Sequence, residues 1–138
     1  MYQELALQIA QKAHAGQVDK AGKDYILHPM TVASYMDTDT EKTIAYLHDV
    51  LEDTDVTVDA LRKIFPNEIV DTLITLTHRK DESYFEYIQR VSKSKLAKKV
   101  KVADLLHNLD ITRIKEPTKQ DYERLEKYKK AILYLTTH

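Results

Sequence analysis

The chain is organised around the stretch Ala45-Tyr46-Leu47-His48-Asp49-Val50-Leu51-Glu52-Asp53-Thr54, which sets one imidazole and three carboxylates among apolar residues. On an α-helix, side chains three or four residues apart share a face. A helix over this stretch would bury its apolar side and present four ionisable groups on the other: His48, Asp49, Glu52 and Asp53. Buried charges are costly unless they are paired or bound to a metal. The stretch therefore predicts a metal site whose remaining ligands come from elsewhere in the chain.

The composition is that of one soluble globular domain over residues 1–138. With 43% hydrophobic and 31% charged residues, the chain is long and apolar enough to bury a core. It contains no cysteine, which excludes disulfides, thiolate metal ligands and cysteine nucleophiles. No apolar run approaches the ~20 residues of a membrane span, and the first residues lack a signal-peptide pattern. We therefore expect a cytoplasmic protein.

The formal net charge is −1, so no global field attracts the chain to nucleic acid or to a membrane. Lysines crowd residues 93–101, and we interpret this run as a solvated helix face. No basic surface interleaved with aromatic residues is apparent, which disfavours direct nucleic-acid binding. The expected partner is a small molecule, and the sequence leaves the oligomeric state open.

Apolar spacing and capping residues predict an all-α fold, a single compact bundle of about seven or eight helices. Pro29 disfavours helix at His28 and suits the first helical position, so His28 is expected just outside a helix entrance. Thr40 is the expected N-cap of the helix that carries the central stretch. The expected helices cover residues 2–15, 29–36, 40–53, 57–65 and 67–77, and Asn67 is the expected N-cap of the last of these. Three further helices are expected to begin at Ser83, Ser94 and Thr118, and the one that begins at Ser94 runs to Leu109.

Two further residues could complete a metal site with His48 and Asp49. A catalytic metal keeps three or four protein ligands and an open position, so the missing ligands must arrive through folding. His28 stands at a helix entrance after a loop that contains lysines. Asp104 interrupts an apolar segment, where a carboxylate needs a partner. These four residues are the candidate ligands.

The order His28, His48-Asp49 and Asp104 resembles the H…HD…D signature of the HD hydrolase superfamily. Over nearly the whole chain, the sequence is similar to the hydrolase domain of the RelA/SpoT alarmone proteins and to their small metazoan-type relatives. An isolated His-Asp pair is common by chance, whereas the full ordered set is specific. The matching segments are Gly16-Gln17, Lys20-x-Gly22, Tyr25-x-x-His28-Pro29, His48-Asp49-x-x-Glu52-Asp53-Thr54 and Lys101-x-Ala103-Asp104-x-x-x-Asn108.

The resemblance implies an all-helical domain that removes the 3′-pyrophosphate of (p)ppGpp, giving GDP or GTP and pyrophosphate. A metal would lower the pKa of a bound water and polarise a phosphoryl oxygen. Glu52 and Asp53 are then expected to position or deprotonate the water and to manage the leaving group. The sequence leaves open which of these two carboxylates is the base. The resemblance implies that one Mn²⁺ ion is bound by four ligands: His28, His48, Asp49 and Asp104.

The same resemblance assigns further side chains to the substrate. Lys20 and Lys80 match phosphate-contacting lysines of the family. Asn108 matches an asparagine that contacts the nucleoside. Arg124 and Tyr128 match an arginine and a tyrosine that line the nucleotide pocket of the small relatives. The remaining histidines are interpreted as structural, among them His14, His78 and His107.

Two positions depart from the family pattern. Asp19 stands where the long alarmone enzymes have an arginine that stacks on guanine, and a carboxylate cannot stack and repels phosphate. Leu105 replaces the basic residue that usually follows the metal-binding aspartate. Both changes remove cations from the expected nucleotide face, so another nucleotide, such as NADPH or a nucleoside phosphate, is an alternative substrate. A nucleotide-binding module without turnover is a third hypothesis.

Overall fold

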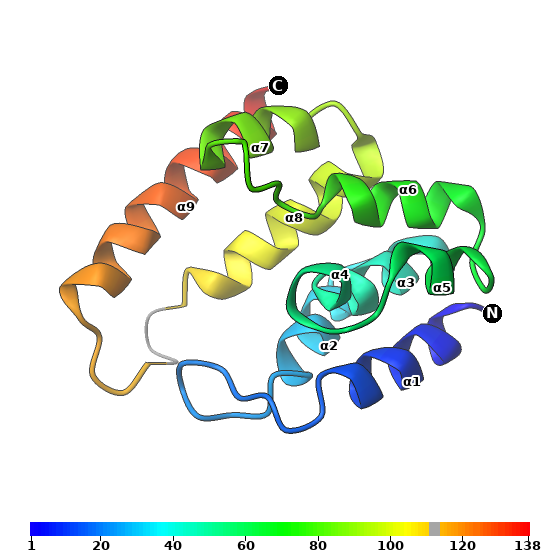
Figure 1. Cartoon of the computed structure of the whole chain (residues 1–138). Helices are drawn as coiled ribbons and strands as arrows, with labels where there is room; N and C mark the ends of the chain where they lie inside the picture. Colours follow the sequence, from blue (N-terminus) through cyan, green and yellow to red (C-terminus); the bar gives the residue numbers. More distant parts are fainter. Residues whose placement is uncertain (111–113) are drawn as a thin grey trace.

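The computed structural model describes residues 1–110 and 114–138 and confirms the predicted all-α fold (Figure 1). The described residues form nine helical segments, or eight if the break between α3 and α4 is ignored. They form no strand, only an isolated bridge between Val18 and Asp24. Within the described ranges, no helix is long and apolar enough to cross a membrane. The segments are α1 (Gln3–Ala13), α2 (Leu27–Ser34), α3 (Asp39–Leu47), α4 (Val50–Asp53), α5 (Val58–Arg62), α6 (Asn67–Thr75), α7 (Tyr84–Val91), α8 (Lys95–Asn108) and α9 (Lys119–Thr137).

Helix α8 lies at the centre of the fold. It packs against α2 and α3 on one side and against α7 and α9 on the other (Figure 1). Ile44 and Leu47 of α3 are fully buried in the core, as is Val100 of α8. Full burial of an aliphatic side chain of this size contributes about 1.5–3 kcal/mol. Because α2, α3 and α8 meet in this core, polar residues on their facing sides are brought to one place.

Side-chain caps start most of the helices. The helix starts predicted at Ser83 and Thr118 are confirmed, and both form capping boxes, in which the hydroxyl accepts a hydrogen bond from the backbone N–H three residues later. Ser94 caps α8 as predicted. The prediction of Asn67 as an N-cap is wrong, since it is the first residue of α6 and Pro66 precedes it.

The helix that carries the central stretch is capped by Thr38, not by the predicted Thr40. The Thr38 hydroxyl accepts a hydrogen bond from the Glu41 N–H at 3.1 Å, and the Glu41 carboxylate accepts from the Thr38 N–H at 3.2 Å. This reciprocal pair satisfies two N–H groups at the helix start. Thr40 has threonine three residues later and cannot close such a box.

His28 lies inside α2, and the expectation that it precedes the helix is wrong. Helix α2 begins at Leu27, with Pro29 at its third position. The first four N–H groups of a helix have no intrahelical partner, so the missing proline N–H is tolerated there. His28 therefore projects from the first turn of a helix that packs against α8.

The helix predicted over residues 40–53 is interrupted at His48 and Asp49, between α3 and α4. The Ala45 carbonyl accepts hydrogen bonds from the His48 backbone N–H at 3.4 Å and from its ring Nδ1 at 2.6 Å. The ring thus competes for a carbonyl that a continuous helix would offer to the residue four positions later. Asp49 has φ −107° and ψ −3°, away from regular helical values. The prediction of one continuous helix is wrong.

Candidate active site

The structure brings the four candidate metal ligands together from three parts of the fold. His28 comes from α2, the His48-Asp49 pair from the break after α3, and Asp104 from α8. The Oδ1 atom of Asp104 lies 2.7 Å from His28 Nε2 and 3.5 Å from His48 Nε2. The Oδ2 atom of Asp49 lies 3.0 Å from His48 Nε2 and 4.0 Å from His28 Nε2. Two imidazole nitrogens and two carboxylate oxygens therefore converge.

The interruption between α3 and α4 makes this convergence possible. Adjacent side chains do not face each other on a regular helix. At the break, however, His48 Nε2 and Asp49 Oδ2 lie 3.0 Å apart. Leu47 and Val50, on either side of the pair, are fully buried and anchor it. The backbone break aims two neighbouring side chains at the same point.

A backbone contact fixes the tautomer of His48. Its Nδ1 donates to the Ala45 carbonyl, so Nε2 carries the lone pair in the neutral ring. Nε2 is buried and makes no hydrogen bond to any described residue, although carboxylate oxygens of Asp49 and Asp104 lie within 3.5 Å. A buried polar atom of this kind needs an explanation. A nitrogen lone pair that faces carboxylate oxygens fits a metal ion between them.

The ligand group carries more negative charge than a buried site tolerates unaided. The residues His28, His48 and Asp104 are only 4%, 5% and 5% exposed. Burial lowers the pKa of His48, but the carboxylates of Asp49 and Asp104 raise it by more. The net pKa is well above the usual value of a histidine. Burial raises the pKa of Asp104, yet Lys101 and His48 hold it well below its usual range. The group therefore gains from added positive charge, which a divalent cation would supply.

Further hydrogen bonds hold the ligand side chains in place. Asp104 Oδ2 accepts from Lys101 Nζ at 2.9 Å, and its Oδ1 accepts from Asn108 Nδ2 at 3.0 Å. The Tyr25 hydroxyl donates to Asp49 Oδ2. Contacts of this kind orient metal ligands, and their loss typically costs about 10–100-fold in metal affinity or activity.

The α8 face that carries Asp104 holds two residues whose role the sequence interpretation missed. His107 Nδ1 lies 2.7 Å from His28 Nδ1, so one ring donates to the other. The interpretation of Lys101 as part of a solvated helix face is wrong, because its side chain is 14% exposed. Lys101 and His107 each stand three residues from Asp104, a spacing that predicts a shared helix face. That spacing is visible in the sequence.

The ligand group lines a cavity of about 210 Å³, which we call the His–Asp cavity. Glu52 and Asp53 of α4 line it as well. Glu52 Oε1 accepts a hydrogen bond from the His78 backbone N–H at 2.9 Å. Ligand atoms of Asp49, Glu52 and Asp53 lie within 4.8 Å of one another. Burial, together with the Asp49 and Glu52 charges, raises the pKa of Asp53.

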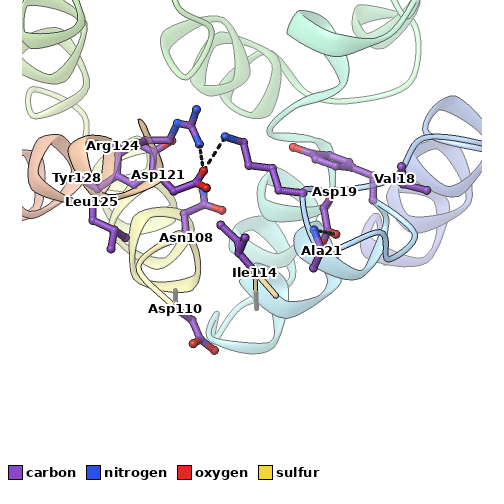
Figure 2. Close-up of a pocket in the computed structure, with 12 residues that line it drawn as sticks. Val18, Asp19, Ala21, Asn108, Asp110, Ile114, Asp121, Arg124, Leu125 and Tyr128 are labelled. Carbon is purple, nitrogen blue, oxygen red and sulfur yellow. Dashed lines mark hydrogen bonds and ion pairs between the residues drawn. The ribbon is translucent and has the colours of Figure 1, made fainter. Parts of the chain in front are cut away.

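A second cavity, of about 290 Å³, adjoins the first, and we call it the Lys20–Arg124 cavity (Figure 2). The loop before α2 and residues of α9 line it. Lys20 Nζ and Arg124 Nη1 each lie 3.2 Å from Oδ1 of Asp121, where the dashed lines of Figure 2 meet. Both cavities are lined by the same three residues, so they lie next to each other: Tyr25, Asn108 and Tyr128.

Most of the predicted substrate residues lie at these cavities. Lys20, Arg124, Asn108 and Tyr128 all line the Lys20–Arg124 cavity. Lys80 is exposed and is not among the described residues that line either cavity. The structure therefore groups four of these five side chains and leaves Lys80 apart.

The two departures from the family pattern lie in different environments. Asp19 lines the Lys20–Arg124 cavity, and its Oδ1 accepts from the N–H groups of Ala21 and Lys23 at 2.8 and 3.0 Å. Its carboxylate therefore shapes the turn that carries Lys20. Leu105 is buried among the apolar side chains of the core and also lines the His–Asp cavity.

An all-helical fold that joins a His-Asp pair to a histidine and an aspartate from distant helices has the architecture of an HD-type divalent-metal protein. The HD domain family matches residues 6–133, nearly the whole chain. The chain therefore belongs to the HD domain family. The notable feature of its site is the buried group His28, His48 and Asp104, whose ligand atoms lie close enough to hold one ion.

Two relatives with similar sequences are much longer proteins. A guanosine-3′,5′-bis(diphosphate) 3′-pyrophosphohydrolase of Borreliella burgdorferi is 35% identical over 132 residues, which covers 84% of this chain and 20% of that protein. A probable GTP pyrophosphokinase of Mycobacterium leprae is 32% identical over 129 residues, covering 83% of this chain and 16% of that protein. The chain thus spans a fifth or less of the length of these two relatives.

A solved structure of similar size matches the whole fold. It is that of a metazoan SpoT ortholog, described as hydrolysing ppGpp and as playing a role in starvation responses, and the TM-score is 0.81. The two sequences are 25% identical, and the match covers 97% of this chain and 84% of that one. The helices described above are therefore arranged as in that protein.

Proposed function

We propose that the chain is a metal-dependent pyrophosphohydrolase that removes the 3′-pyrophosphate of (p)ppGpp. The observation that carries this proposal is the meeting of four candidate metal ligands with the acid pair Glu52 and Asp53 at one cavity. The likeness to a metazoan SpoT ortholog described as hydrolysing ppGpp supports the same reaction. So does the name of the Borreliella burgdorferi relative.

The proposed ion is Mn²⁺, since imidazole nitrogens and carboxylate oxygens together suit a first-row divalent metal. When bound, such an ion lowers the pKa of a water and polarises a phosphoryl oxygen. The chain itself contributes fixed placement, because Asp104 is held by Lys101 and Asn108. The proposed ligands are His28, His48, Asp49 and Asp104.

The acid pair is proposed to divide the proton transfers. Glu52 is oriented by the His78 backbone N–H and faces the same cavity as the ligands, so it is placed to take a proton from the attacking water. Asp53 has a raised pKa and keeps its proton to higher pH than an ordinary aspartate. We assign to it the donation of a proton to the 3′-oxygen of the leaving nucleoside when the P–O bond breaks.

The two cavities suggest how the substrate lies. The 3′-pyrophosphate belongs in the His–Asp cavity, where the reacting phosphorus meets the ligands and the acid pair. The nucleoside and its 5′-phosphates then extend past Asn108 and Tyr128 into the Lys20–Arg124 cavity. There Lys20 and Arg124 are held side by side by Asp121, and each retains further N–H donors for phosphate oxygens.

The test is incubation of the purified protein with ppGpp and Mn²⁺, followed by quantification of all products. We expect equimolar GDP and pyrophosphate, no reaction in excess EDTA, and recovery when Mn²⁺ is restored. His48→Ala should be inactive, whereas His138→Ala, at the exposed C-terminal residue, should match the wild type. Absence of pyrophosphate release by the Mn²⁺-loaded wild type would refute the proposal.

A second candidate, a phosphohydrolase acting on another nucleotide such as NADPH, is favoured by the acidity of the Lys20–Arg124 cavity. Its lining includes three carboxylates beside the two cations: Asp19, Asp110 and Asp121. Such a lining repels the terminal 5′-diphosphate of ppGpp more than the pyrophosphate of NADPH, which is esterified at both ends and carries less negative charge. Phosphate release from NADPH at a higher kcat/KM than pyrophosphate release from ppGpp would select this candidate. Mn²⁺ binding without turnover of either nucleotide would select a binding module.

A further inference from the structure

Two neighbouring tyrosines of α7 line the His–Asp cavity but differ in how their hydroxyl groups are satisfied. The Tyr87 hydroxyl donates to the Leu76 carbonyl at 2.6 Å. The Tyr84 hydroxyl is buried and makes no hydrogen bond with the described part of the chain. A buried hydroxyl without a partner destabilises a folded protein, and native proteins keep few of them. We therefore expect a bound ligand to supply the hydrogen-bond partner that the Tyr84 hydroxyl lacks.

The surroundings of Tyr84 indicate the chemistry of that ligand. Burial raises the pKa of Tyr84, so the hydroxyl stays protonated and acts as a donor. The buried Lys101 ammonium lines the same cavity, 5.1 Å from the centre of the Tyr87 ring. Lys127 Nζ lies 4.3 Å from the centre of the Tyr84 ring and 5.6 Å from that of Tyr128. A hydroxyl donor among ammonium groups is complementary to an anion with acceptor oxygens.

The position of Tyr84 within the cavity narrows the anion further. One wall, from α2, α4 and the break after α3, carries His28, the His48-Asp49 pair and the acid pair. Tyr84 and Lys101 belong to α7 and α8, and the Lys101 ammonium is bonded to Asp104 at 2.9 Å. When the reacting phosphorus of a diphosphate meets the ligand group, the same cavity of about 210 Å³ offers these two donors to its second phosphate.

We propose that the Tyr84 hydroxyl, with Lys101 beside it, binds the terminal phosphate of a substrate pyrophosphate group. This inference rests on the proposed function and deepens it, because it makes the cavity selective for pyrophosphate esters over phosphate monoesters. A monoester would occupy the ligand group and leave the Tyr84 hydroxyl without a partner. The cavity then favours ppGpp over a substrate such as NADPH, whose scissile group is a single phosphate.

The two tyrosines provide a matched pair for the test. The Mn²⁺-loaded wild type, Tyr84→Phe and Tyr87→Phe are titrated calorimetrically with inorganic pyrophosphate and, separately, with inorganic phosphate. Tyr84→Phe should raise the Kd for pyrophosphate about tenfold, the loss of roughly one charge-assisted hydrogen bond, and change the Kd for phosphate less than twofold. Tyr87→Phe should leave both Kd values within twofold of the wild type.

The Tm of the ligand-free variants separates a binding role of Tyr84 from a purely structural one, because the two roles predict opposite changes in Tm for Tyr84→Phe. Tyr84→Phe removes an unsatisfied hydroxyl, so its Tm should equal or exceed that of the wild type. Tyr87→Phe removes a satisfied one and should lower the Tm. A lower Tm for Tyr84→Phe with unchanged pyrophosphate affinity would assign Tyr84 to the packing of α7 and overturn the inference.

The titration separates this inference from the proposed function. If the wild type hydrolyses ppGpp while Tyr84→Phe binds pyrophosphate as tightly as the wild type does, the inference is wrong and the function stands. If the wild type does not hydrolyse ppGpp while Tyr84→Phe loses pyrophosphate affinity selectively, the inference stands and the function is wrong. Equal losses for phosphate and pyrophosphate, or no pyrophosphate binding by the wild type, would also overturn it.

Discussion

The His–Asp cavity and the Lys20–Arg124 cavity adjoin each other but are built in different ways. In the first, the side chains of His28, His48 and Asp104 are buried and come from helices or a helix break that the core holds. In the second, Lys20 belongs to a loop and is 53% exposed, and Arg124 is 32% exposed. A rigid, buried constellation suits chemistry, whereas exposed side chains on a loop can adjust to a ligand.

The difference in burial predicts how each cavity responds to substitution. Removing one partner from a buried charged group leaves an uncompensated charge and costs about 3–5 kcal/mol. The ion pair of Lys20 with the buried Asp121 contributes less, because the Lys20 side chain is 53% exposed and water screens its charge. Substitutions in the His–Asp cavity should abolish the reaction, and those in the Lys20–Arg124 cavity should tune substrate affinity.

The largest effect is expected from His48→Ala. Loss of this ligand should release the metal and lower kcat for ppGpp by about 10³-fold or more, because the ion supplies several kcal/mol of transition-state stabilisation. Product quantification and elemental analysis of the purified variant measure the two losses together. A variant that kept its metal and its activity would show that the His–Asp cavity is not where the reaction takes place, contrary to the proposed difference between the cavities.

Glu52→Gln should be nearly as damaging but for a different reason. Loss of the proposed base should lower kcat by about 10²–10⁴-fold while the metal content stays at the wild-type level. The matched control is Glu68→Gln, an exposed glutamate of α6, which should change neither quantity. Loss of metal from Glu52→Gln would instead make Glu52 a ligand.

A smaller effect is expected at His107, which contacts a ligand but is not proposed as one. His107→Ala frees the His28 ring and should weaken Mn²⁺ binding by about 10–100-fold, with a smaller change in kcat at saturating metal. Titration with Mn²⁺ measures this, and Leu106→Ala, an exposed neighbour on α8, is the control. Unchanged metal affinity in His107→Ala would show that the His107 contact does not hold His28 in place for the metal. Only the ligands Asp49 and Asp104 would then have supporting hydrogen bonds that matter.

The smallest effect is expected in the Lys20–Arg124 cavity. Lys20→Met should raise KM for ppGpp about tenfold, the equivalent of one charge-assisted hydrogen bond, and leave kcat within about twofold. Lys23→Met, in the same loop, should leave both constants unchanged. A loss of kcat without a change in KM would place Lys20 in the chemistry and weaken the comparison between the cavities.

The helical fold was predictable because its signals are local. Apolar spacing and the caps at Ser83, Ser94 and Thr118 depend on residues within one or two turns. The break at His48 and Asp49 was not predictable in this way. Its contact is equally local, since the His48 ring reaches the Ala45 carbonyl three residues earlier, but the apolar spacing around it is that of a continuous helix and gives no sign of the break.

The candidate ligands could be selected from sequence because each is a polar residue at a place that needs a partner, and the resemblance supplied their order. The residues around them were harder to select. Lys101 stands among solvated lysines, and only the fold shows that its side chain is buried against Asp104. Tyr84 and Tyr87 have the same side chain on the same helix, and only their contacts separate them.

The metal position can be seen in a crystal of the protein grown with Mn²⁺ and measured at the manganese absorption edge. We expect one anomalous peak between His28, His48, Asp49 and Asp104, with no protein ligand from the Lys20–Arg124 cavity. A peak at another position, or no peak in the His–Asp cavity at saturating Mn²⁺, would show that this cavity does not hold the catalytic metal.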